Sequence, residues 1–137
     1  IKGFDKNFFL YFEENDLFYR LKKANLKMYK IQNAYHYHTS IESSSAVMEN
    51  KDEKYYSYLL TGWHGQWSKF YYLKKYNGFF YSFVKCLPNL ITNIIKLILK
   101  SFLDYKKAKY IYFKIEGLVC SIIGIPSFKR NKYDKFV

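Results

Sequence analysis

Acidic and imidazole side chains gather in the first third of the chain. Glu13, Glu14 and Asp16 lie close together, and His36 and His38 follow after a helix-length segment. Carboxylates and imidazoles are the groups that proteins use to hold a divalent metal ion and to remove a proton from a hydroxyl. The segment is therefore a candidate site for metal-assisted acid–base chemistry. Acidic residues in a first helical turn also stabilise that helix through its dipole, so the spacing alone leaves both roles open.

Apolar periodicity predicts the elements that position these groups. Apolar residues recur at helical spacing over residues 14–24, which places the carboxylates in the first turn of a helix. Two short strands are expected next, over residues 27–31 and 34–38, because the side-chain pattern alternates there. His36 and His38 would then share one face of the second strand.

Three further helices are predicted, over residues 53–76, 79–103 and 104–123. The middle helix is two-faced, with large aliphatic residues on one side and a polar stripe on the other. The stripe consists of Lys85, Asn89, Asn93, Lys96 and Lys100. We favour a helix that lies in a membrane surface. The alternative is a helical hairpin with residues 104–123 that buries both apolar faces in solution.

Composition and charge indicate a folded chain with two parts. The 137 residues are 50% hydrophobic and 23% aromatic, which excludes a disordered tail. The protein has a net charge of +12. Residues 1–52 hold eight basic and seven acidic residues, whereas residues 53–137 hold 15 basic and four acidic residues. We therefore expect an acid-bearing part, residues 1–48, and a basic helical part, residues 49–137. A strong positive charge favours anionic partners.

Two smaller features limit the protein class further. Cys86 and Cys120 show no metal-binding or redox spacing, so we expect them to be free and buried. The longest uncharged stretch near the middle, residues 86–95, is shorter than the ~20 residues that a membrane-spanning helix needs. No transmembrane helix is therefore expected.

Ordered motifs extend over residues 3–44. They are Gly3-Phe4-Asp5, then Tyr11-Phe12-Glu13-Glu14-Asn15-Asp16-Leu17 with Arg20, then His38 with Ser43-Ser44. Together these motifs resemble the second half of family 2 glycosyltransferases, in particular the rhamnosyltransferase-like branch that builds bacterial surface polysaccharides. The segment from Trp63-His64 through Trp67 to Lys75, and residues 117–130, look like the helical extension of the same branch.

The resemblance implies a fold and a reaction. The fold would be helix-rich α+β, with residues 1–48 as the C-terminal, acceptor-side part of a GT-A-type α/β domain with short strands and residues 49–137 as a helical extension. The reaction would be an inverting transfer of a sugar from a nucleotide-diphosphate sugar donor to a glycan or lipid-linked acceptor in bacterial surface polysaccharide synthesis. The donor-binding half of the family lies upstream of Gly3, and the chain begins with Ile1. We therefore expect a fragment of a longer enzyme that is inactive alone.

The resemblance also implies residue roles. Glu14 matches the catalytic base, and Asp16 matches the second acidic position, which holds the acceptor or orients the base. Glu13 flanks them at the acceptor. His38 matches the histidine that helps to ligate the divalent metal, Mg or Mn, on the donor diphosphate. One face of the helix over residues 53–76 adds Trp63, His64 and Trp67, which are candidates either for stacking on the acceptor sugar or for the helix core.

The expected location follows from charge and family together. We expect a cytoplasmic enzyme, peripheral on the inner face of the cell membrane, that contacts an anionic membrane surface. The alternative function is a non-catalytic basic module that binds a membrane surface. A nucleic-acid-binding module is disfavoured, and no nucleic-acid partner is expected, because only two of the basic residues are Arg and the aromatics are spread over helical faces.

Overall fold

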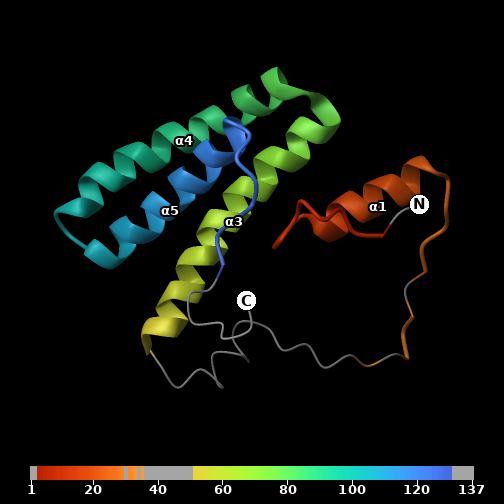
Figure 1. Cartoon of the computed structure of the whole chain (residues 1–137), viewed down its shortest axis with the longest axis horizontal. Helices are drawn as coiled ribbons and strands as arrows, with labels where there is room; N and C mark the ends of the chain where they lie inside the picture. The colour runs from red at the N-terminus through yellow and green to blue at the C-terminus, as the bar shows by residue number, and fades with distance from the viewer. Residues whose placement is uncertain (1–2, 30, 34, 36–50, 131–137) are drawn as a thin grey trace.

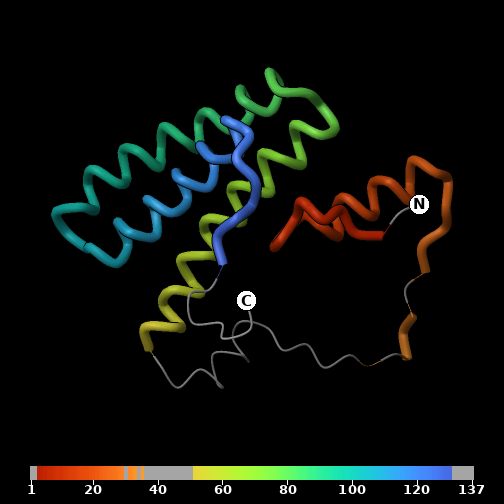
Figure 2. The backbone as a smooth tube through the Cα atoms, in the orientation of Figure 1, coloured from red at the N-terminus to blue at the C-terminus, as the bar shows by residue number. Residues whose placement is uncertain are grey.

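The computed structural model describes residues 3–29, 31–33, 35 and 51–130. These residues form α1 (Glu13–Lys23), α3 (Lys51–Asn77), α4 (Phe79–Ser101) and α5 (Tyr105–Ile122). α3 is the long central helix, α4 and α5 run antiparallel to each other and pack on it, and α1 lies apart from the α4–α5 pair (Figure 1). After α5 the chain turns back along α3, as the backbone trace in Figure 2 shows.

The α+β fold expected from the sequence is wrong. The described residues contain helices and no strand, so they form a helical bundle rather than the short-stranded part of a GT-A domain. Within the expected strand 27–31, the described residues are irregular, and all of the expected strand 34–38 except Tyr35 lies outside the described residues. A strand needs a hydrogen-bonded neighbour to be stable, and alternation over so few residues does not supply one.

The predicted helices are confirmed to within a few residues, because local signals set their ends. Asn25 adopts a left-handed φ of 56° just after α1, and Gly78 does so, at 82°, between α3 and α4. Asp104 caps α5, since its Oδ1 accepts a hydrogen bond from the backbone N–H of Lys107 at 3.0 Å. Gly124, with a φ of 83°, follows the end of α5.

The core lies where α3 and α5 approach each other most closely. Leu59, Trp63 and Trp67 of α3 pack with Phe113 and Cys120 of α5. A second cluster joins Phe70 of α3, Cys86 of α4 and Leu118 of α5. Cys86 and Cys120 are both free and buried, as expected.

Gly117 permits this close approach, because a Cβ there would overlap the backbone carbonyl of Trp63. We expect Gly117→Ala to destabilise the protein by about 1–3 kcal/mol, since one helix backbone must move away from the other. Chemical denaturation measures the change. The matched control is Gly65→Ala in α3, where the nearest atom lies 3.7 Å away and the better helix former should stabilise by about 0.5–1 kcal/mol. Equal effects of the two substitutions would contradict a close contact at Gly117.

Candidate functional site

The predicted catalytic carboxylates follow a strained turn. Tyr11 and Phe12 both have a left-handed backbone, with φ of 68° and 67°. Such conformations cost about 1–3 kcal/mol each for non-glycine residues and persist only where other contacts fix them. Here Ser68 of α3 donates a hydrogen bond to the carbonyl of Leu10 at 2.8 Å, and Phe12 packs on Tyr72 with ring centroids 5.4 Å apart. α3 therefore holds the turn that starts α1.

Asp16 is the buried acidic residue of α1, and its carboxylate is 0% exposed. It accepts hydrogen bonds from Lys75 Nζ at 2.5 Å, from the Tyr76 hydroxyl at 2.6 Å and from Arg20 Nε at 2.8 Å. Burial raises the pKa of Asp16, but the bonds from Lys75, Tyr76 and Arg20 outweigh it, so the pKa is lowered and the group is ionised at neutral pH. Asp16 thus fastens α1 to α3.

Lys75 joins Asp16 to a second carboxylate, that of Asp5. Its Nζ lies 2.7 Å from Asp5 Oδ2, and the Tyr71 hydroxyl donates to the same oxygen at 3.2 Å. Burial lowers the pKa of Lys75, but the bonds to Asp16 and Asp5 raise this pKa by a larger amount. The pKa of Lys75 is therefore well above the usual range. The two acidic elements of the sequence motif, around Asp5 and around Asp16, therefore meet at one lysine.

Glu13 and Glu14 differ from Asp16 in their surroundings. Glu14 is exposed, and it takes part in no ion pair or hydrogen bond with the described residues. Glu13 is half-buried, and its Oε2 is buried without a hydrogen-bond partner in the described part of the chain. Among the three acidic residues of α1, Asp16 is thus engaged by the protein, whereas Glu14 is open to a molecule from solution.

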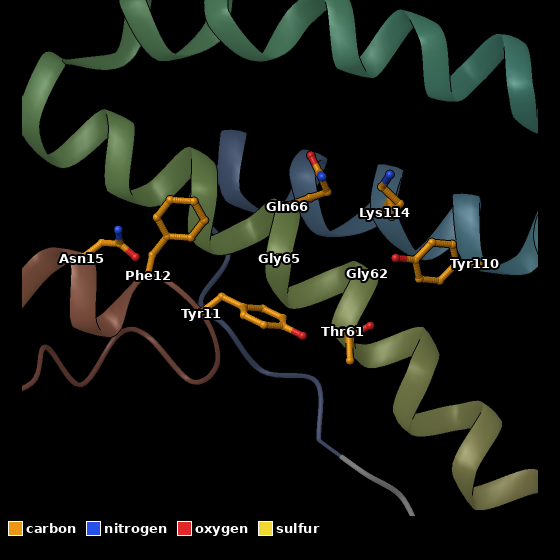
Figure 3. A pocket seen from close by; sticks show the side chains of 9 residues that line it. All are labelled: Tyr11, Phe12, Asn15, Thr61, Gly62, Gly65, Gln66, Tyr110 and Lys114. Atoms are coloured by element: carbon orange, nitrogen blue, oxygen red, sulfur yellow. The ribbon is translucent and has the colours of Figure 1, made fainter. Parts of the chain in front are cut away.

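A cavity of about 430 Å³ opens beside the same turn (Figure 3). Tyr11, Phe12 and Asn15 line it from the α1 side. Gln66 of α3 and Tyr110 and Lys114 of α5 line it from the bundle. Burial lowers the pKa of Lys114, with contributions from the positive charges of Lys96 and Lys69. Aromatic rings with amide, hydroxyl and ammonium groups are typical linings of small-molecule sites.

Trp63, His64 and Trp67 lie in the core, at most 3% exposed. Trp67 Nε1 donates a hydrogen bond to the Ile125 carbonyl at 2.8 Å, and His64 Nε2 lies 2.9 Å from the Lys129 carbonyl oxygen. The structure therefore brings together the two later sequence elements that resembled one extension. It places the three rings against the protein's own chain, and their role at an acceptor sugar stays a prediction.

His64 has its hydrogen bonds arranged for a neutral ring. The Nε2–H donates to the Lys129 carbonyl, and Nδ1 accepts from the Ser127 hydroxyl at 3.1 Å. Burial lowers its pKa to about 4, and the nearby charges of Arg130 and Lys129 act in the same direction. The imidazole is therefore uncharged at neutral pH and fastens the segment after α5 to α3.

The predicted metal site is not formed by the described residues. They contain no group of three metal-ligating side chains, and the predicted ligand His38 lies outside them. The divalent metal therefore stays a prediction.

Sequence analysis did not identify Lys75 as part of the site. A signal is present, because Ser68, Tyr71 and Lys75 recur at helical spacing on the side of α3 that meets the first segment. A lysine on such a packing face is favoured where opposite charges lie opposite it, since partial burial of an unpaired ammonium is costly. Asp5 and Asp16 are those charges.

A comparison of the chain with models of known protein families, with curated protein sequences and with solved structures finds no match.

Proposed function

We propose that this chain carries the acceptor-side machinery of an inverting glycosyltransferase, with Glu14 as the catalytic base. One observation carries the proposal: Asp16, Lys75 and Tyr76 fix the first turns of α1, while Glu14 in the same helix remains exposed. A base must be held rigidly and yet reach the reacting hydroxyl, and this arrangement meets both needs.

The reaction has simple requirements. The acceptor hydroxyl oxygen attacks the anomeric carbon of the donor sugar, and Glu14 takes the hydroxyl proton. The bond from the anomeric carbon to the diphosphate oxygen breaks on the opposite face, and its electron pair leaves with the nucleoside diphosphate. The configuration at the anomeric carbon is inverted. The cavity lined by Asn15, which follows Glu14 in sequence, is a candidate space for the acceptor sugar.

Asp16 then acts as a positioning residue. Its carboxylate is bonded to three side chains of the protein, so it orients α1 and thereby the base. Glu13 is a candidate for contact with the acceptor, because its Oε2 lacks a partner in the described chain.

The test is sugar transfer by the full-length protein, supplied with a set of nucleotide-diphosphate sugars and a polyprenyl-linked glycan acceptor. We expect Glu14→Gln to lower turnover by about a hundredfold or more, because loss of a general base removes a factor of that order. The matched control is Glu53→Gln, a glutamate in the first turn of α3, which should retain turnover. Turnover within fivefold of the unchanged protein for Glu14→Gln would disprove the base assignment. Absence of transfer from every donor would disprove the function.

A further inference from the structure

α4 is amphipathic, yet its small and polar side faces the protein. The buried residues of α4 are Ser82, Cys86 and Asn93, each at most 5% exposed and all on one side of the helix. Asn93 donates a hydrogen bond to Asn89 of the same polar stripe. The polar stripe predicted from the sequence therefore faces the bundle at Asn93 instead of facing water.

The large aliphatic residues of α4 lie on the opposite side. Ile91, Ile95 and Ile98 are 49, 52 and 59% exposed. We define the outer face of α4 as Val84, Ile91, Ile94, Ile95, Ile98 and Leu99, all of which are exposed. The expected hairpin of α4 with α5 exists, but it leaves this apolar face uncovered. A continuous exposed apolar face of this kind marks an interaction surface.

Lysines border one edge of the outer face of α4, and aromatic rings lie at its two ends. Lys85 and Lys96 are exposed. Because each residue of an α-helix is rotated by about 100° from the one before, both lysines fall along one edge of this face. Phe80 and Phe102, at the two ends of the helix, are 85 and 87% exposed. Lysines that border an apolar surface and aromatic rings at its ends are typical of the boundary between lipid headgroups and acyl chains.

The packing of α5 determines how α4 meets a bilayer. By length and composition alone, α4 is long enough and apolar enough to cross a membrane, and only 17% of its most apolar window is buried. The uncharged residues 86–95 by themselves did not indicate this. α5, however, packs beside α4 and carries Lys106, Lys107, Lys109 and Glu116. A crossing α4 would draw these charges toward the hydrocarbon, at a cost of ~3 kcal/mol for each charge at its centre. α4 therefore fits a position parallel to the membrane plane.

Charge favours a lipid surface over a second copy of this chain. Two copies packed by their outer faces would bring the lysine edges of two proteins, each of net charge +12, close together. An anionic lipid surface instead attracts each nearby lysine by about 1 kcal/mol. We propose that the outer face of α4 inserts into the headgroup region of an anionic membrane, with the helix axis parallel to the surface. This proposal does not depend on the glycosyltransferase function.

Vesicle binding by the full chain tests the proposal. We expect binding to vesicles that contain phosphatidylglycerol and much weaker binding to phosphatidylcholine alone. The variant Ile91→Gln/Ile95→Gln/Ile98→Gln should lose about a hundredfold or more in partitioning, because three apolar side chains no longer gain from leaving water. The matched control Leu26→Gln/Ile31→Gln changes exposed apolar residues away from α4 and should bind within threefold of the unchanged protein. Lys85→Gln/Lys96→Gln should lose about thirtyfold in partitioning, at about 1 kcal/mol for each lysine.

Three results would overturn membrane docking by this face. Equal binding of the triple variant and the unchanged chain would show that the outer face of α4 is not the docking surface. Equal binding to neutral and anionic vesicles would exclude the electrostatic contribution. A self-association that the triple variant abolishes, without vesicle binding, would assign the face to a second copy.

The orientation of the helix is measured by quenching of the fluorescence of Ile95→Trp by brominated lipids. Quenching near the headgroups supports a parallel helix, and quenching strongest at the bilayer centre contradicts it.

Discussion

Replacing Lys75 with Met is expected to release α1 from α3 at a cost of about 3 kcal/mol. The substitution removes a cation from the carboxylate of Asp16, which is 0% exposed, and from that of Asp5. Among the described residues, the buried carboxylate of Asp16 then keeps only the bonds from Arg20 and Tyr76. Losing one partner of a buried charge costs more than the pair contributes. Because α1 contacts the bundle mainly through side chains, the loss should appear as local opening of residues 13–23.

Hydrogen exchange measures this opening directly. The amide protons of α1 should exchange roughly a hundredfold faster in Lys75→Met, whereas those of α3 and α5 should change little. Lys74→Met is the matched control, since Lys74 is the exposed neighbour on the same helix and its ammonium lies 5.9 Å from the Phe79 ring. Adding Asp16→Asn to Lys75→Met should restore part of the protection, because the buried carboxylate that lost Lys75 is then neutral. Unchanged exchange in α1 would refute the anchoring role of Lys75.

Acid should weaken the same anchor. The pKa of Asp16 is lowered in the folded protein, chiefly by Lys75, Tyr76 and Arg20 acting against burial. The stability that this carboxylate contributes is therefore fully present above its unfolded pKa of about 3.9, and it is lost as the pH falls through the folded value.

Helix positions could be predicted from the sequence because their signals are local. Apolar periodicity and the end signals at Asn25, Gly78 and Asp104 act within a few residues, and the structure uses all three. The predicted strand over residues 27–31 was wrong, because a strand depends on a neighbour that alternation within these residues does not identify.

The candidate site shows the same division. Local spacing placed Glu13, Glu14 and Asp16 together in the first turns of one helix, and the structure agrees. It could not show that Asp16 is buried against Lys75, because that contact joins residues far apart in the chain. The same reason applies to His64, whose partners Ser127 and Lys129 lie on the segment after α5. Amphipathicity likewise located the two sides of α4 but not which side the bundle covers.

The clearest pH effect is expected at His64. Its pKa is about 4 in the folded protein because of burial, against about 6.5 in an unfolded chain. Between these values the unfolded state binds a proton that the folded state does not, so stability falls as the pH is lowered through this interval. The shift corresponds to about 3 kcal/mol over the whole interval. The Ser127 hydroxyl can rotate to accept from a protonated Nδ1, so the penalty comes mainly from burial and from the charges of Arg130 and Lys129.

Urea unfolding at pH 7 and at pH 4.5 isolates this contribution. The unchanged protein should lose about 2–3 kcal/mol more between the two pH values than His64→Gln, whose side chain does not titrate. Gln can still donate to the Lys129 carbonyl, so the variant should fold at pH 7 with the segment after α5 in place. The other two histidines are present in both proteins and cancel in the comparison. Parallel losses of stability in the two proteins would mean that His64 is protonated readily, and so that the segment after α5 does not bury it in solution.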